Sequence, residues 1–217
     1  MNLDSLVEEQ EIVDPLEVAR EQWLAKRRGK FTCSRFGDLV SEGRSKGEIF
    51  SQTGLSYIRR VVAETLGSYY EVSAKSMEWG TEHEPAAIGE YSKRTRSVVE
   101  SAPFQFYEYS EKIGGTPDGL VGKDGCIEVK CPYDPSVHIN TLITKTVPKD
   151  YQWQVVGHLL VTNRQWCDFI SFDPRIEGPQ RLCVVRVNRD EELIGFLLAR
   201  LTAACEEMQR MLNLICE

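Results

Sequence analysis

The 217-residue sequence has few histidines, no long apolar run and no excess of basic residues. No apolar stretch approaches the roughly 20 residues that a membrane-spanning helix needs, so we expect no contact with a membrane. The sequence also lacks a phosphate-cradling glycine loop and a Ser/His/Asp set, which leaves ATP hydrolysis and acyl transfer without support. The acidic start, MNLDSLVEEQEIVD, is unlike a secretory signal or a transit peptide, and we expect a cytoplasmic location.

Zinc binding and histidine catalysis find little support either. The seven cysteines are odd in number and scattered, and only Cys126 and Cys131 lie near each other, without the second pair that a zinc site needs. We interpret all seven as reduced and most of them as small core residues. The three histidines, His83, His138 and His158, are interpreted as surface or packing residues.

The net charge argues against nucleic-acid binding, but the distribution of the basic residues does not exclude it. The net charge of −7 argues against a nucleic-acid ligand, because an acidic surface repels a polyanion. The basic residues, however, gather in three short segments, at 26–30, 59–60 and 93–96. A global sum is a poor guide when charges cluster in this way, so a local surface for nucleic acid is compatible with the sequence.

The order of elements predicts the fold class. We expect an acidic tail over residues 1–13 and a single domain over residues 14–217. The pattern predicts helices at 14–29, 32–40, 53–66, 73–93, 136–146, 150–161 and 189–214, with Asp14 and Thr32 as N-caps, a loop at 41–52 and amphipathic character at 150–161. Strands are predicted at 98–101, 104–109, 114–121, 126–131, 166–172 and 182–187. This order indicates an α/β fold, a central mixed β-sheet flanked by helices.

The stretch at 113–133, IGGTPDGLVGKDGCIEVKCPY, carries two carboxylates and a lysine in a fixed order. Residues 126–131 alternate as a strand does, which places Glu128 and Lys130 on one face and Val129 on the other. The turn at 123–125 allows the chain to reverse. We therefore predict a hairpin that brings Asp118 beside Glu128 and Lys130.

These groups predict a site for a hard divalent cation. Mg²⁺ prefers oxygen ligands and usually takes one or two protein carboxylates, completing its shell with water and phosphate oxygens. Asp118 and Glu128 would supply the carboxylates, and the Val129 carbonyl a third oxygen. Lys130 would hold or deprotonate a water and offset charge in the transition state. A metal with a lysine beside it suits phosphodiester hydrolysis.

At these residues the sequence resembles the PD-(D/E)xK nuclease superfamily, with Pro117-Asp118 and Glu128-Val129-Lys130 as the motif. Five ordered patches are similar to one family within it, the phage lambda exonuclease or YqaJ-type viral recombinase family. They are WLAKRRGKFTCS at 23–34, MEWGTEHE at 77–84, PDGL at 117–120, EVKCP at 128–132 and YQWQ at 151–154. The resemblance spans nearly the whole chain.

The resemblance implies a restriction-endonuclease-like core and a metal-dependent deoxyribonuclease. Such an enzyme digests one strand of linear double-stranded DNA from 5′ to 3′, releases 5′-mononucleotides and leaves a 3′ single-stranded tail for phage-type recombination. It also implies Mg²⁺ as the cofactor, with Mn²⁺ able to substitute, a homotrimeric ring around the DNA, and a single-strand annealing protein as partner.

The resemblance also implies roles for individual residues. The residues implied at the metal centre are the ligands Asp118, Glu128 and the Val129 carbonyl, the catalytic Lys130, and Glu84 acting through water. Glu84 seen alone is a surface carboxylate. The residues implied at the DNA end are Arg27, Ser34, Thr116 and Gln154 around the 5′-phosphate, Met77 as an apolar wedge, and Arg44 reaching toward the minor groove.

The sequence departs from the family pattern at two positions, and two alternative functions remain open. Thr116 stands where a relative has serine, and Val156 stands where a second glutamine is common. The same superfamily contains endonucleases of restriction or repair type, which do not require a DNA end. A catalytically inactive DNA-binding scaffold is the other alternative, although such a relative usually loses one of Asp118, Glu128 and Lys130.

Overall fold

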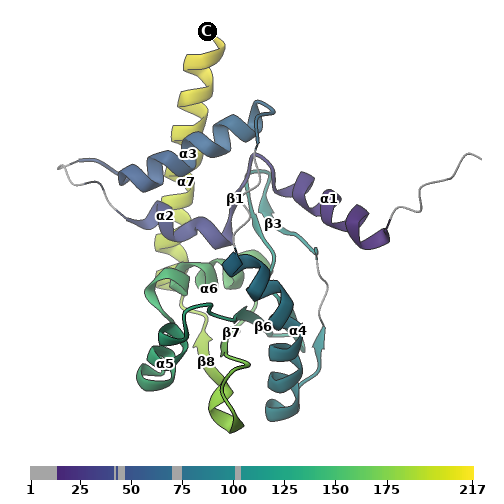
Figure 1. Ribbon diagram of the computed structural model, residues 1–217. Helices are drawn as coiled ribbons and strands as arrows, with labels where there is room; N and C mark the ends of the chain where they lie inside the picture. Colours follow the sequence, from purple (N-terminus) through teal and green to yellow (C-terminus); the bar gives the residue numbers. More distant parts are fainter. Residues whose placement is uncertain (1–13, 42, 44–46, 70–74, 101–103) are drawn as a thin grey trace, which may run out of the picture.

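The computed structural model describes residues 14–41, 43, 47–69, 75–100 and 104–217, which form two β-sheets with helices packed on them (Figure 1). The predicted acidic tail at 1–13 and Arg44 in the predicted loop lie outside the described residues. Within the described part of the chain, no helix is both long and apolar enough to cross a membrane. The alternation of helices and strands confirms the predicted α/β class.

The larger sheet has the order β2 (Val99–Glu100), β5 (Gly119–Val121), β6 (Gly125–Lys130), β7 (Trp166–Phe172) and β8 (Leu182–Asn188). The β6 and β7 strands are parallel, and the other neighbours are antiparallel, so this sheet is mixed, as predicted. The predicted hairpin is the β5–β6 pair. The β6 strand is buried from Gly125 to Val129, as expected of a central strand covered on both faces.

The smaller sheet corrects one prediction. It has the order β1 (Phe31–Thr32), β4 (Ile113–Gly115) and β3 (Tyr107–Ser110). The single strand predicted at 114–121 is wrong, because β4 belongs to this sheet and β5 to the larger one. Pro117 has no N–H to donate to a strand ladder, so the chain leaves one sheet there and enters the other. Asp118 therefore lies at the crossing between the two sheets.

Most predicted helices are present. The start of α1 (Pro15–Arg27) is confirmed, since the Asp14 side chain accepts a hydrogen bond from the Leu16 N–H. Helices α3 (Gln52–Thr65), α4 (Lys75–Thr95), α5 (Pro135–Thr144) and α7 (Glu191–Cys216) also lie where they were predicted. The helix predicted at 32–40 is shorter: a 3₁₀ turn covers Cys33–Arg35 and α2 spans Phe36–Val40. Thr32 takes the predicted N-cap position before this turn, but its side chain makes no capping hydrogen bond. Its N–H donates to the Tyr57 hydroxyl.

The helix at the centre of the molecule is α6 (Lys149–Thr162). It contacts α2, α7, both sheets and the 3₁₀ turn before α2. Every residue from Val155 to Val161 is buried, so the predicted amphipathic character is wrong for this half of the helix. A helix enclosed on all sides needs no polar face. The fixed position of α6 matters for the site below, because its buried half includes His158.

The core consists of two apolar clusters, one on each face of β6. Cys126 joins the cluster that contains α6, whereas Ile127 and Val129 join the cluster that contains Tyr91 of α4. This division follows from the alternation of side chains along a strand. All seven cysteines are free, and five of them are buried, as predicted: Cys33, Cys126, Cys131, Cys167 and Cys183.

Candidate active site

The β5–β6 hairpin brings Asp118 to the end of β6. The Asp118 N–H donates to the Ile127 carbonyl at 3.1 Å, and the Val129 N–H donates to Asp118 Oδ2 at 2.6 Å. In a strand, the N–H and C=O of one residue face the same neighbour. The Val129 carbonyl is therefore turned toward Asp118, the position that the predicted third oxygen ligand requires.

Glu128 is fully buried and both of its oxygens have partners. Lys130 Nζ donates to Oε1, and His158 Nε2 lies 2.7 Å from Oε2. The Lys130 ammonium also lies 5.2 Å from the centre of the Tyr151 ring. Tyr151 and His158 lie two turns apart on α6, so one helix contacts both members of the Glu128–Lys130 pair.

The three acidic residues of the site influence one another's ionisation. Burial and the Glu128 charge raise the pKa of Asp118 well above its ordinary value, and the same two causes raise the pKa of Glu84. Burial acts to raise the pKa of Glu128 too, but Lys130 and His158 outweigh it and the pKa is lowered. In return, Glu128 and Asp118 raise the pKa of Lys130 against the effect of burial. Glu84, on α4, thus belongs to the same electrostatic cluster.

The residues of this cluster fit a hydrated Mg²⁺ better than a metal held by protein alone. No group of three or more His, Cys, Asp or Glu side chains within the described ranges has metal-binding geometry. Two carboxylates and one carbonyl are nevertheless the number of protein oxygens that Mg²⁺ usually takes. Desolvated carboxyls that raise each other's pKa are stabilised in the ionised form by a cation. The metal roles of Asp118, Glu128, Val129 and Glu84 stay predictions.

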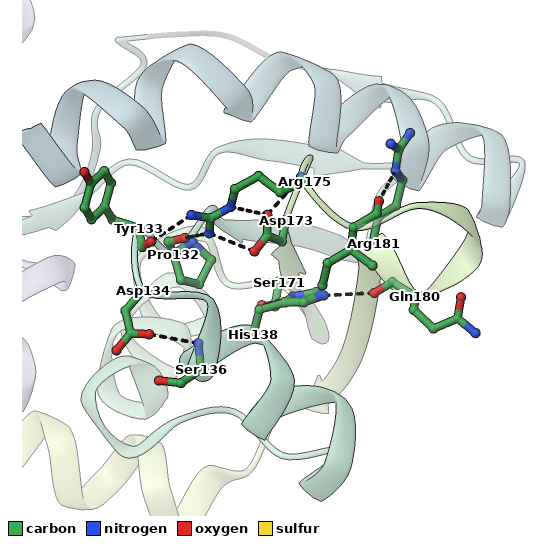
Figure 2. Close-up of polar contacts among 11 residues, drawn as sticks. Pro132, Tyr133, Asp134, Ser136, His138, Ser171, Asp173, Arg175, Gln180 and Arg181 are labelled. Carbon is green, nitrogen blue, oxygen red and sulfur yellow. Dashed lines mark hydrogen bonds and ion pairs between the residues drawn. The ribbon is translucent and has the colours of Figure 1, made fainter.

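The segment after Lys130 is held by Arg175 (Figure 2). The Arg175 guanidinium donates to Asp173 at 2.8 Å through both Nε and Nη2, and to the carbonyls of Pro132 and Tyr133 at 3.2 Å. It also lies 4.8 Å from the Trp79 ring centre. Trp79 is on α4, the helix that carries Glu84, so Arg175 joins this helix to the segment that follows β6.

A basic cavity of about 880 Å³ lies between α1, the 3₁₀ turn, α3 and the start of α4. Three predicted DNA-end residues line it: Arg27, Ser34 and Met77. Met77 is 57% exposed, as a wedge that meets a ligand must be. The structure thus brings Met77 to the same cavity as Arg27 and Ser34, which lie far from it in the sequence, although their roles stay predictions.

Arg27 differs from three of the other cations in this cavity, Lys30, Arg35 and Arg60. Lys30 is paired with Glu108 at 2.5 Å, Arg35 with Asp38, and Arg60 with Glu64 at 3.1 Å. Within the described residues, Arg27 has no ion pair and instead lies over the Trp23 ring at 4.2 Å. Burial lowers its pKa, with Tyr57, Cys33 and Glu64 acting in the opposite direction. A partly desolvated guanidinium without a carboxylate is suited to an external anion.

The other predicted DNA-end residues in the described part of the chain, Thr116 and Gln154, do not line this cavity themselves. The Thr116 hydroxyl accepts a hydrogen bond of 2.8 Å from Trp23 Nε1, and Trp23 lines the cavity. Thr116 therefore connects the cavity to the segment that leads into Asp118. Gln154 is half-buried on α6, and no contact joins it to the cavity among the described residues. Arg44 is outside the described residues.

Sequence reasoning missed two residues at this site. His158 was interpreted as a packing residue, but it contacts Glu128, so that interpretation is incomplete. Its signal was a single polar residue, aligned with Tyr151, within the otherwise apolar run at 155–161. Arg175 gave no signal, because the groups that it binds come from separate parts of the chain.

Known proteins share this fold. A family profile described as YqaJ-like viral recombinase domain matches residues 22–165, and none of the curated proteins matches. The alkaline exonuclease LHK-Exo from Laribacter hongkongensis is 30% identical over 90% of this chain and 95% of its own, with a TM-score of 0.80. Its complex with dAMP has the same identity and coverage and a TM-score of 0.81. A phage-related exonuclease from Haemophilus somnus 129PT, 22% identical over 86% of this chain and 96% of its own, has the same fold with a TM-score of 0.72.

The profile covers more than half of the chain, and the likeness to LHK-Exo extends over nearly all of it. The predicted fold class, an α/β fold with a PD-(D/E)xK nuclease core, is confirmed by this likeness. The resemblance predicted from five sequence patches is confirmed as well: this chain belongs to the YqaJ-like viral recombinase family.

Proposed function

We propose that the protein is a Mg²⁺-dependent exonuclease that digests one strand of linear double-stranded DNA from 5′ to 3′. Membership of the family and the likeness to an alkaline exonuclease support a DNA nuclease. The observation that carries the proposal is the cluster of Asp118 and Lys130 around the buried Glu128, which Thr116 and Trp23 join to a basic cavity. The products would be 5′-mononucleotides and a 3′ single-stranded tail for annealing.

The residues of the cluster divide the chemistry among them. Asp118, Glu128 and the Val129 carbonyl would hold Mg²⁺, which neutralises phosphate charge and makes a bound water more acidic. Lys130, fixed by Glu128 Oε1, donates hydrogen bonds to the attacking water or to the phosphate and offsets the charge that develops there. Its raised pKa favours the ammonium form that this role requires. Glu84 would orient water at the edge of the site.

The cavity would bind the end of the strand that is digested. Arg27 is suited to a terminal 5′-phosphate because it is partly desolvated and has no ion pair within the described residues. Ser34 and Thr116 would add hydroxyl donors, and Gln154 an amide. Met77, exposed at the start of α4, would separate the terminal base pair at a cost of a few kcal/mol. Arg44 would reach toward the minor groove.

The proposal extends to assembly. A homotrimeric ring with its basic cavities facing inward would let a chain of net charge −7 enclose a polyanion. A single-strand annealing protein would receive the 3′ tail. Mn²⁺ would replace Mg²⁺, since both accept carboxylate and water ligands.

The decisive experiment is digestion of linear duplex DNA with Mg²⁺ or Mn²⁺. It compares 5′-phosphorylated with 5′-hydroxyl ends, labels each strand separately and includes closed circular duplex. We expect release of mononucleotides from the 5′-ended strand, a preference for the phosphorylated end and intact circles. Nicked or cut circles would instead indicate an endonuclease, and no cleavage with either metal would indicate a DNA-binding scaffold.

A Lys130→Ala variant serves as the control for chemistry in the same assay. Removing one hydrogen-bond donor that stabilises charge in the transition state typically lowers the rate by about 100-fold or more, so the cleavage rate should fall at least that far. Binding of Mn²⁺ and of DNA should persist, because the carboxylates and the cavity are unchanged. Cleavage near the wild-type rate would show that the catalytic role belongs to another residue.

A further inference from the structure

The contact between His158 and Glu128 is the most enclosed polar contact of the site. The His158 side chain is 1% exposed and that of Glu128 is 0% exposed, and the two are joined at 2.7 Å. Lys130, the other partner of Glu128, is 26% exposed and binds the opposite oxygen. The two oxygens of one carboxylate are therefore held from two sides, by a strand neighbour and by a helix.

The position of the imidazole is fixed by the packing of α6. His158 lies within the run from Val155 to Val161 that is buried on all sides. Its neighbour Gly157 lies so close to Phe36 that a Cβ there would approach the ring to 2.6 Å. The helix cannot move nearer to α2, and it cannot withdraw without opening the core. The ring nitrogen is thus presented to Glu128 by a rigid element.

The direction of the hydrogen bond follows from the chemistry of the pair. An ionised carboxylate only accepts, so His158 must donate from Nε2. That nitrogen then has no lone pair for a metal, and Nδ1 makes no hydrogen bond within the described residues. His158 therefore contacts the proposed metal site as a donor to Glu128 and not through a lone pair of Nε2. A donor on Oε2 opposes rotation of the carboxylate away from Asp118 and satisfies an oxygen that burial would otherwise leave without a partner.

We propose that His158 is a positioning residue for the metal ligand Glu128, acting through the Nε2–H···Oε2 hydrogen bond. The inference rests on the proposed metal site, which it deepens by adding a residue outside the motif. A packing role alone would require only the volume of the ring. A positioning role requires a donor at the place of Nε2, and this difference can be measured.

The test compares two variants in a Mn²⁺ titration of the DNA-free protein by calorimetry. His158→Leu keeps much of the volume and removes the donor, so Mn²⁺ affinity should fall by about 10- to 100-fold. His158→Gln returns an N–H near the position of Nε2 and should stay within about threefold of wild type. The matched controls are His138→Leu and His138→Gln. His138 is equally buried, but it bonds to Ser171 and the Gln180 carbonyl instead (Figure 2).

Both leucine variants should lose thermal stability, but only His158→Leu should lose metal affinity. Unchanged affinity in His158→Leu, or an equal loss in His138→Leu, would overturn the positioning role and leave the proposed metal site intact. If wild-type protein binds no Mn²⁺, the metal part of the proposed function fails, and the positioning role fails with it.

A second measurement needs no variant and applies even if His158→Leu does not fold. The chain has only three histidines, so their ring N–H signals can be resolved by ¹⁵N NMR of the wild-type protein. Addition of Mg²⁺ should shift the His158 Nε2–H signal, because the acceptor carboxylate gains a cation, and should leave His138 unchanged. An unchanged His158 signal at saturating Mg²⁺, with binding shown by calorimetry, would overturn the proposal.

Discussion

A substitution of Arg27 tests the proposed recognition of the 5′-phosphate separately from the chemistry of cleavage. Within the described residues it has no ion pair, unlike Lys30, Arg35 and Arg60 in the same cavity. A hydrogen bond to a charged group contributes roughly 1.5–3 kcal/mol, or about 10- to 100-fold in rate. Arg27→Ala should therefore slow digestion of 5′-phosphorylated ends by that factor and change digestion of 5′-hydroxyl ends little.

The control for this prediction is Arg28→Ala. Arg28 lines the same cavity but lies over the Tyr69 ring at 3.6 Å. Its loss should affect both kinds of end alike, through general attraction of DNA. Initial rates on the two substrates measure the ratio directly. An unchanged ratio in Arg27→Ala would assign the 5′-phosphate to another residue.

For individual residues, the sequence predicted the contacts between residues that lie close together along the chain. Asp118, Glu128 and Lys130 belong to one hairpin, so alternation and a turn were sufficient to bring them together. His158 reaches Glu128 only because α6 docks on the sheet, which no local pattern encodes. Thr116 likewise meets Trp23 across more than 90 positions of the chain. The contacts that form through tertiary packing were therefore the ones that the sequence did not predict.

At the scale of elements, Arg175 joins the segments that follow β6 and β7 through its hydrogen bonds to Pro132 and Asp173 (Figure 2). It also contacts helix α4 through the Trp79 ring. Its hydrogen bonds to Asp173 lower the pKa of that carboxyl. A carboxyl with a lowered pKa in the folded state stabilises the protein above its ordinary pKa and loses this contribution as the pH falls through the lowered value. Since Arg175 is itself exposed, we expect a contribution of about 1 kcal/mol.

The measurement is the free energy of unfolding in urea from pH 7 down to pH 3. Asp173→Asn should be less stable than wild type at pH 7, and the difference should shrink as the pH falls below the ordinary range of an aspartate. Arg210→Ala, which breaks an exposed pair with Glu207, is a control with a smaller effect at every pH. A wild-type advantage of the same size at pH 3 as at pH 7 would show that the loss comes from packing and not from the charge of Asp173.

The elements themselves were predicted where their patterns are long. The strand at 166–172 and the helix ending the chain were predicted closely, because many residues repeat the same period. The prediction of one strand at 114–121 was wrong, since β4 and β5 are only three residues each and are told apart by their partners in two different sheets. The enclosure of α6 could not be foreseen either, because it results from two sheets and two helices meeting around it.

At the scale of the whole molecule, the negative net charge opposes the proposed binding of DNA, which is a polyanion. A chain of net charge −7 that attracts DNA must concentrate its basic groups on the surface that DNA meets. The cavity at α1 and α3 is such a concentration, whereas the acidic N-terminal residues and the 190–192 segment lie elsewhere in the sequence. One cavity is small beside a duplex, and three of them around an axis would make a continuous basic lining.

The proposed ring leads to a prediction about both assembly and processivity. Light scattering should give three times the mass of one chain at the concentrations used for digestion. Because a closed ring cannot leave the duplex sideways, digestion that has begun should continue after heparin is added to capture free enzyme. If a monomer continues through the heparin challenge, the ring is wrong, since an acidic monomer would be holding DNA by surface contacts alone. If a trimer stops at once, the three chains assemble without enclosing the duplex, and the basic cavities need another arrangement.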